Sequence, residues 1–442
     1  MSQIAQISQR EIFPSNRSNA ANTWSYKDGN PTLVFSINEQ EAYLMSSTLR
    51  LNFKLRLQLP GTGTNPPVFP QNFAGQEVRL NAKIGALACF SSYNITNSRN
   101  QSLERVINAP RLAATLVPAQ ANWSSYANEL QLECSATGND DTQGRRCDHE
   151  QEVCCRVLAG CFLMGDNIPL GPAGRGCSGL TIRFNLAPSI EALYGAQAAN
   201  AWYEIVNPSL TFQAGIPPGG VLPNIAALPY TSFSSFYSTI ANSDETQNIN
   251  CGLSSVISTF SNFVPTSYIA NVTEDGNESY TLRNAPYTSD GNYAPITHYT
   301  TFKQGLKYPY QFSVDETEMI TQDGTSYSAE GYTAQRARNF LSALQPSKDR
   351  TATLCGNLSE QGIGSSKVPP RGQHYNTMGA HVFGCGSRFD GVGNGSGANF
   401  KNASFSHRFR SDLDGNSPNS VYTFMLHRNM INFAGGGISV AN

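Results

Sequence analysis

Residues 48–59, TLRLNFKLRLQL, alternate strictly between polar and apolar side chains. The apolar members of this series are Leu49, Leu51, Phe53, Leu55, Leu57 and Leu59. Successive side chains of an extended strand leave opposite faces of a sheet, so the pattern predicts a strand with one buried face and one exposed face. Such a strand needs a second layer that covers its apolar side.

The same period of two recurs along the chain. It predicts further strands at 179–187, 307–314 and 421–426. Asp-Gly pairs, which tolerate the positive φ of tight turns, recur at 28–29, 275–276, 290–291, 323–324, 390–391 and 414–415. Many strands separated by such turns predict an all-β sandwich or barrel, not a sheet of alternating strands and helices.

Helical patterns are few. Residues 100–116 place a small apolar group on one helical face, namely Leu103, Val106 and Ile107, and a proline then interrupts the pattern. Residues 329–346 carry apolar residues at spacings of three and four, and Pro346 ends that pattern. We therefore expect about one helix among the strands of each half.

The two halves of the sequence resemble each other. Residues 201–214 (AWYEIVNPSLTFQA) and 421–434 (VYTFMLHRNMINFA) both look like a strand with a central asparagine and an apolar end. Residues 214–224 are rich in proline and glycine, which is typical of a linker. At about 100–200 residues per domain, the chain divides into 1–217, with an N-terminal arm, and 218–442.

Composition and charge exclude several classes of protein. The formal net charge is −2, whereas a nucleic-acid binder needs a basic excess, so we expect no sequence-specific nucleic-acid binding. No apolar stretch approaches the length of about 18 residues that a membrane helix needs. The first residues, MSQIAQISQREIF, lack a signal-peptide pattern, so we expect cytosolic synthesis and reduced thiols.

A cysteine-rich region carries the strongest chemical signal. Its metal-binding residue types are Cys134, Cys147, His149, Cys154, Cys155, Cys161 and Cys177. Their spacing lacks the paired pattern of a zinc site, and neighbouring Cys154 and Cys155 would point to opposite faces of a strand. The apolar run 153–164 favours a barrel strand with cysteines as small hydrophobic residues. Disulfides formed after cell lysis and a metal site are the alternatives.

Other motifs favour structure over chemistry. The segment 411–416, SDLDGN, lacks the glutamate that completes a calcium loop, and His374 and His381 match no metal-binding spacing. Gly435–Gly437 is no phosphate loop, because no Lys-Ser/Thr follows it. The sequence predicts no catalytic residue, no cofactor-binding residue and no metal ligand.

Basic residues gather on one strand face and in one short segment. Arg50, Lys54 and Arg56 share a face of the first predicted strand, and HRFRSD occupies 407–412. A solvated or ion-paired face is the favoured interpretation of both, and a face turned toward a genome is the alternative.

An ordered set of segments resembles the double jelly-roll major capsid proteins of double-stranded DNA viruses. In order, the segments are 47–59, 84–113, 165–195, 201–212, 254–270, 302–316 and 423–440. Residues 84–113 resemble the family's succession of a central strand, a turn, an acidic residue (here Glu104) and a short helix. The most specific segment is 302–316, whose F-x-x-G-x-x-Y-P pattern is similar to polinton-like virus and virophage capsid proteins. The cysteine-rich region departs from the family pattern.

The resemblance implies two consecutive eight-stranded jelly rolls with a few short helices in loops. It implies a homotrimer of pseudo-hexagonal outline that tiles an icosahedral shell, without catalysis or a cofactor. Expected partners are neighbouring capsomers, penton and minor capsid proteins, with weak contact to a genome or internal membrane on the inner face. The expected location is the virion, after synthesis in the host cytoplasm.

Two other classes remain as alternatives. One is a jelly-roll lectin, fibre or spike that binds glycans, and the other is a β-sandwich enzyme acting on polysaccharide. The few tryptophans, Trp24, Trp123 and Trp202, are scattered, which disfavours both. For residues 1–12 we expect an arm that reaches a neighbouring capsomer.

Overall fold

The computed structural model describes a chain built mainly from strands. The described residues are 4–16, 22–58, 79–80, 85–120, 151–163, 167–172, 174–194, 201–240, 244–265, 310–314, 317–322, 342–344, 385–389, 397–401, 405–410, 419–433 and 439–441. All strand pairs among them are antiparallel. The predicted all-β class is confirmed.

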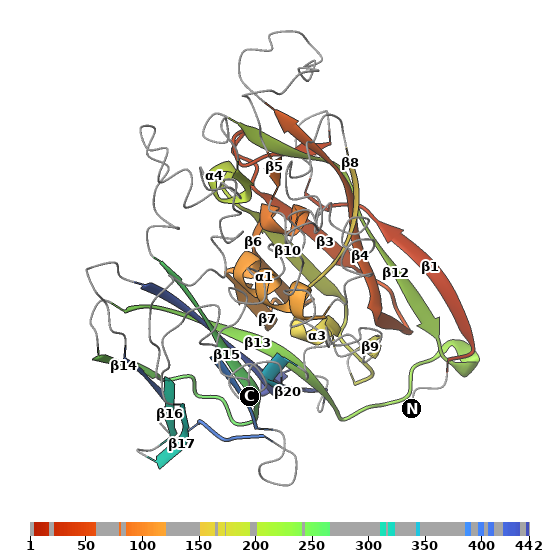
Figure 1. Cartoon of the computed structure of the whole chain (residues 1–442). Coiled ribbons are helices and arrows are strands. Elements are labelled where there is room, and N and C mark those ends of the chain that lie inside the picture. The colour runs from red at the N-terminus through yellow and green to blue at the C-terminus, as the bar shows by residue number, and fades with distance from the viewer. Residues whose placement is uncertain are drawn as a thin grey trace, which may run out of the picture.

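The first half forms a two-sheet sandwich (Figure 1). One sheet has the order β1 (Gln6–Ile12), β12 (Trp202–Ile216), β4 (Ala42–Gln58) and β8 (Gln151–Arg156), with β2 (Thr23–Trp24) on β12 and β9 (Asn167–Leu170) on β4. The other has the order β3 (Thr32–Ile37), β10 (Leu180–Leu186), β6 (Phe90–Asn97) and β7 (Ser102–Ile107). A small pair joins β5 (Arg79–Leu80) and β11 (Leu193–Tyr194).

The second half again contains two sheets. The first has the order β13 (Ala227–Ile240), β20 (Asn419–Asn432), β15 (Val256–Pro265) and β18 (Cys385–Arg388), with β21 (Ser439–Ala441) on β20. The second has the order β14 (Asp244–Ile249), β19 (Phe405–Arg410), β16 (Tyr310–Val314) and β17 (Thr317–Gln322).

The described helices are short. They are η1 (Ala86–Cys89), α1 (Ala109–Gln120), α3 (Gly160–Leu163), α4 (Ser189–Ala192), η2 (Pro218–Gly220) and the helical residues 342–344. None of them has the length and apolar character that crossing a bilayer requires.

The two halves share one strand order. If the eight main strands of each half are numbered along the chain, the sheets read 1-8-3-6 and 2-7-4-5 in both. Two sheets linked by such crossing connections make a jelly roll. The segments that looked alike in sequence, 201–214 and 421–434, fall on the eighth strand of each half, β12 and β20. The total number of strands per jelly roll stays a prediction.

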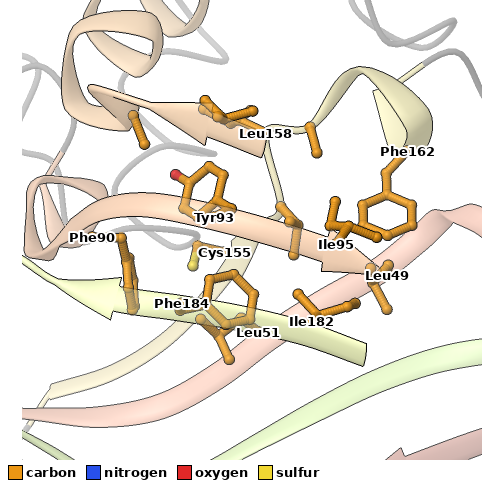
Figure 2. Packing of buried hydrophobic residues seen from close by; sticks show 14 of the residues in the cluster. Leu49, Leu51, Phe90, Tyr93, Ile95, Cys155, Leu158, Phe162, Ile182 and Phe184 are labelled. Carbon is orange, nitrogen blue, oxygen red and sulfur yellow. The ribbon is translucent and has the colours of Figure 1, made fainter. Parts of the chain in front are cut away.

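The core of the first sandwich lies between its two sheets. Along β4 the predicted alternation is confirmed, with Leu51 and Leu55 buried and Arg50 and Lys54 partly exposed. On the facing sheet, β10 repeats the pattern, and Phe184 lies at the centre of the aromatic contacts (Figure 2). The Phe184 ring centroid is 6.0 Å from that of Phe35, 5.6 Å from Phe90 and 5.6 Å from Tyr93.

The predicted helix over 100–116 is wrong in its first part. Residues 102–107 form β7, whose register pairs Tyr93 with Val106 and Ile95 with Glu104. The pairing with β6 outweighs the weak helical pattern. Asn108, with φ 56°, ends the strand, and α1 then begins at Ala109. Pro110 stands in the first turn, where a proline costs no hydrogen bond, so it does not interrupt the helix.

Strand β20 also differs from expectation. The alternation in 421–426 predicted one exposed face, yet Val421, Thr423 and Met425 are as buried as the residues between them. Both faces of this strand are therefore covered. Of the other second-half predictions, 310–314 is a strand as expected, and Leu344 lies in a helical turn, whereas 329–341 fall outside the described residues.

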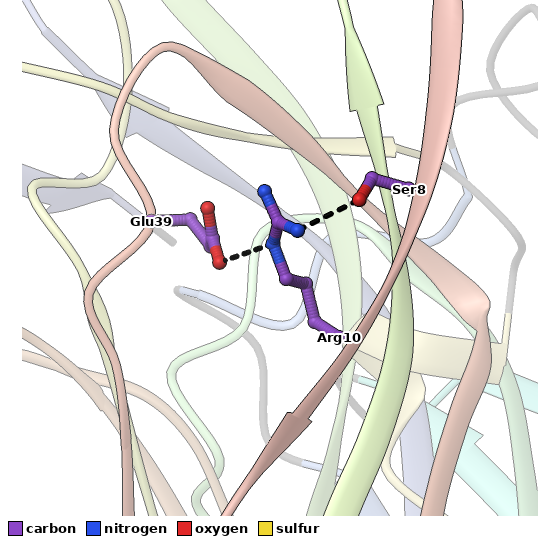
Figure 3. Close-up of polar contacts among 3 residues, drawn as sticks. All are labelled: Ser8, Arg10 and Glu39. Carbon is purple, nitrogen blue, oxygen red and sulfur yellow. Dashed lines mark hydrogen bonds and ion pairs between the residues drawn. The ribbon is translucent and has the colours of Figure 1, made fainter.

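The N-terminal segment is not an arm where the structure describes it. Gln6–Ile12 pair along their whole length with β12 as strand β1. Arg10 links this strand to the segment after β3, because its Nε donates to Glu39 Oε1 at 2.8 Å (Figure 3). Its Nη1 donates to Ser8 Oγ of the same strand at 2.7 Å, which orients the guanidinium group. The linker likewise begins later than predicted, because β12 continues to Ile216.

We expect Phe184→Ala to lower the free energy of unfolding by about 3–5 kcal/mol, since it leaves a cavity among three aromatic rings. Arg183→Ala, on the exposed face of the same strand, is the control and should change it by less than about 0.5 kcal/mol. Chemical denaturation measures both. Equal effects of the two substitutions would show that Phe184 is not a core residue.

Candidate functional site

The two sandwiches meet at a junction between two edge strands. Strand β7 ends one sheet of the first sandwich, and β13 ends one sheet of the second. The two strands contact each other, and α3 contacts both of them (Figure 1). An edge strand carries backbone N–H and C=O groups that its own sheet does not satisfy. The junction must therefore supply partners for these groups.

Glu104, on β7, is the central residue of the junction. Its side chain is buried, and its residue exposure is 3%. Its carboxylate accepts three backbone N–H groups: from Gly160 at 2.7 Å, from Cys161 at 2.8 Å and from Phe233 at 2.9 Å. The first two belong to the start of α3 and the third to β13. One carboxylate thus binds a helix start of the first sandwich and the edge of the second.

The electrostatics of Glu104 are a balance of burial and hydrogen bonds. Burial raises the pKa of its carboxyl group, and the three backbone N–H groups counteract part of that rise. The Cys161 thiol, hydrogen-bonded to the carboxyl group, has a pKa raised well above its usual value by burial and by the nearby acid. A thiol with so high a pKa is a poor nucleophile. The geometry favours a structural role for both groups.

Further hydrogen bonds surround Glu104. The Tyr230 hydroxyl on β13 donates to the Leu103 carbonyl at 2.8 Å, and Thr231 Oγ1 donates to the Gly160 carbonyl at 3.0 Å. Gly160 also allows the close approach, since a Cβ built there would lie 2.8 Å from Cα of Ser232. The backbone of β13 therefore packs directly on the first turn of α3.

A buried polar network extends the junction along the second sandwich. His427 Nδ1 donates to Asn429 Oδ1 at 2.9 Å, so in the neutral ring Nε2 accepts from Ser234 at 2.9 Å and Ser232 at 3.2 Å. Asn429 Nδ2 donates to Ser232 Oγ at 2.7 Å and to the Tyr230 hydroxyl at 3.3 Å. Burial lowers the pKa of His427 to about 4, which keeps the ring neutral at neutral pH.

An apolar contact accompanies the polar one. Phe233, Phe260 and Phe424 of the second half belong to the same cluster of buried residues as the core of the first half. At one side, the buried Arg111 of α1 lies over the ring of Tyr422, 4.8 Å from its centroid. This contact explains why β20 is buried on both faces.

The described residues include part of the cysteine-rich region. Cys154 is exposed and Cys155 is buried on β8, so the prediction of opposite faces is confirmed. The strand ends at Arg156, however, because the chain turns into α3, which places Cys161 at the junction. Within the described part of the chain, no group of three potential ligands could hold a metal. Cys134, Cys147, His149, His374, His381, 411–416 and Gly435–Gly437 lie outside the described residues.

The predicted basic face is paired. Arg56 Nη1 contacts Glu204 Oε2 at 3.1 Å across β4 and β12, and Gln58 Nε2 donates to the same oxygen at 3.2 Å. Asn52 Nδ2 donates to Thr211 Oγ1 at 2.9 Å on the same sheet face. Arg56 is thus ion-paired, whereas Arg50 Nη1 donates to the backbone carbonyls of Ser47 and Leu49. The side chains of 407–410 lie outside the described residues.

Sequence reasoning named Glu104 and Cys161 without predicting a junction, and it missed the other junction residues. Glu104 was visible only through its position between a strand and a helix in the family resemblance. His427 and Asn429 gave one signal, since they are polar residues within an otherwise apolar strand pattern. That signal does not indicate a partner, because Ser232 and Tyr230 are nearly 200 residues away.

Comparison with known proteins extends these observations. No family model and no curated protein sequence matches the chain. Among solved structures, a Faustovirus major capsid protein matches with a TM-score of 0.56 at 9% identity, over 98% of this chain and 91% of that one. The chain has the fold of viral major capsid proteins.

Two further solved structures match nearly the whole chain. A chain of the Sputnik virophage has a TM-score of 0.54 at 12% identity, over 100% of this chain and 89% of that one. A chain of the PBCV-1 virus capsid has a TM-score of 0.54 at 11% identity, over 99% and 97%. The capsid-protein fold therefore accounts for both sandwiches. The predicted resemblance to viral capsid proteins is confirmed at the level of fold.

We expect Glu104→Ala to destabilise the protein by about 3 kcal/mol or more, since three buried N–H groups lose their acceptor. Glu152→Ala, an exposed acid on β8, is the matched control and should have little effect. Chemical denaturation measures the loss, and limited proteolysis between 217 and 227 reports whether the sandwiches separate. A Glu104→Ala protein as stable as the control would contradict the role of the carboxylate.

Acid should weaken the His427 network. The folded-state pKa of about 4 lies below the ordinary 6.5, so the neutral ring contributes stability above pH 6.5 that is lost as the pH falls through 4. The full loss is about 3 kcal/mol. We expect His427→Gln to remove this part of the acid dependence, measured by denaturation between pH 7 and pH 4. Parallel pH profiles of both proteins would refute it.

Proposed function

We propose that the chain is a major capsid protein that self-assembles into homotrimeric, pseudo-hexagonal capsomers of an icosahedral virus shell. The observation that carries this proposal is the shared fold with the Faustovirus major capsid protein over nearly the whole chain. The repeated strand order supports it, because two like sandwiches per chain give six in a trimer. The proposed domains are 1–217 and 218–442, in keeping with strand pairs that stay within 6–216 and 227–441.

The rigid junction supports a structural role. A tile keeps its outline only if its two sandwiches do not move against each other. The buried Glu104 carboxylate and the aromatic contact favour such rigidity. The proposed partners are neighbouring capsomers, penton and minor capsid proteins, with weak contact to a genome or internal membrane on the inner face. The proposed location is the virion, after synthesis in the host cytoplasm, and the proposed role requires no catalysis.

Light scattering during size-exclusion chromatography tests the proposal. We expect a species of three times 47.9 kDa, and hexagonally outlined particles by electron microscopy. No observation favours the glycan-binding alternative, and a glycan array serves as the control. A stable monomer that binds a defined glycan would overturn the capsid proposal.

A further inference from the structure

The linker between the two sandwiches, residues 217–226, combines a glycine-rich start with a tightly held end. Gly219 and Gly220 have positive φ angles of 77° and 70°, which glycine adopts without steric strain. The next residue, Val221, is exposed at 50%. Leu222, by contrast, is buried, and from there on the linker makes hydrogen bonds to both sandwiches. The course of the linker is therefore decided at Leu222.

Glu41 holds the linker at Leu222. It lies between β3 and β4 of the first sandwich, and its two carboxylate oxygens bind different segments. Its Oε2 accepts the Leu222 N–H at 2.7 Å, and its Oε1 accepts Arg175 Nη1 at 2.8 Å. We call Glu41, Arg175 and Leu222 the linker clamp. One carboxylate thus joins the linker to the loop between β9 and β10.

Two further contacts fit the linker onto this loop. Gly171 allows the close approach of Leu222, since a Cβ built at Gly171 would lie 2.8 Å from Leu222 Cδ1. Further along the linker, the Ile225 N–H donates to the Gly174 carbonyl at 3.2 Å. The Ala226 carbonyl then accepts an N–H of the second sandwich at 2.8 Å. The linker therefore passes from the first sandwich to the second within one short segment.

The backbone of Glu41 indicates that its side chain has a specific role. Its φ of 56° lies in the left-handed region, which favours glycine over a residue with a side chain. A glycine here would relieve this strain but would supply no carboxylate. Glu39, in the same connection, binds Arg10 of β1 instead. The two acids therefore hold different segments, and Glu41 is the one that holds the linker.

The linker clamp lies away from the Glu104 junction. In the sheet β3-β10-β6-β7, the junction uses β7, whereas the clamp follows β3, at the other end of the order. Neighbouring strands lie about 4.8 Å apart, so roughly 14 Å separates β3 from β7. In Figure 1 the linker leaves β12 far from β7 before it reaches β13. A contact along one edge leaves rotation about that edge open, and a second attachment away from it blocks the rotation.

We propose that the linker clamp prevents the second sandwich from turning about the junction between β7 and β13. Glu41 is then a positioning residue, which sets the angle between the sandwiches together with Glu104. The proposal concerns the single chain, and it holds whether or not the chain builds a capsid.

Hydrogen exchange of the linker tests the clamp. We expect Glu41→Ala to speed the exchange of the Leu222 N–H about tenfold or more, because this group loses a charged acceptor. Glu41→Gly removes the same acceptor but relieves the backbone strain, so it should speed the exchange as much and unfold at a higher denaturant concentration than Glu41→Ala. Glu39→Ala is the control and should leave the exchange of the linker unchanged. Exchange as slow in both Glu41 variants as in the control would overturn the clamp.

Spin-label distances test the rotation. Nitroxide-bearing amino acids replace the exposed Arg183 of the first half and Lys401 of the second. Labelled chains are diluted with unlabelled ones, so that only distances within one chain are measured. We expect a narrow distance distribution in the otherwise unchanged chain and in Glu39→Ala, and a broader or shifted one in Glu41→Gly. An unchanged distribution in Glu41→Gly would overturn the positioning role, whatever the oligomeric state of the protein.

Discussion

The burial of backbone N–H groups where two edge strands meet is the constraint on which the arrangement of the two halves depends. A buried N–H without an acceptor costs about 1–3 kcal/mol, so the edge of β13 and the start of α3 cannot pack together without one. The Glu104 carboxylate is the acceptor for both segments, through hydrogen bonds of 2.7 to 2.9 Å from the N–H groups of Gly160, Cys161 and Phe233. Its own burial is unfavourable, which the raised pKa expresses, and those same three bonds offset it.

Other features of the junction follow from this bond geometry. The close packing of α3 on β13 requires Gly160 at the contact, because a side chain there would collide with the backbone of Ser232. Close packing then buries the polar side of β20, where His427 and Asn429 must find partners among neighbouring strands. The aromatic cluster adds apolar contact area. Polar groups thus fix how the two sandwiches are placed against each other, and apolar groups fill the contact between them.

Sequence reasoning succeeded where local pattern decides structure and failed where distant segments decide it. The alternation of 48–59 and 179–187 correctly gave strands β4 and β10, because one face of each meets its own sandwich core. In 421–426 the pattern was right about the apolar side, because Tyr422, Phe424 and Leu426 join the core of the first half. It was wrong about the other side, because Val421, Thr423 and Met425 are buried as well. The first part of the helix predicted over 100–116 is instead strand β7. It pairs with β6, a partner that no local pattern reveals.

The contact inside the chain and the outer faces of the chain meet different physical requirements. The internal junction forms once, during folding of a single chain, and can bury a carboxylate, an arginine and a histidine among aromatic rings. A surface that first exists in water cannot expose so many apolar and edge groups, because separate copies would aggregate. The outer face of β4 and β12 accordingly carries paired polar residues such as Arg56 and Glu204, and the exposed apolar groups of β1 are few. Joining two sandwiches in one chain thus lets the internal contact bury apolar and charged groups permanently, while the outer faces carry polar groups.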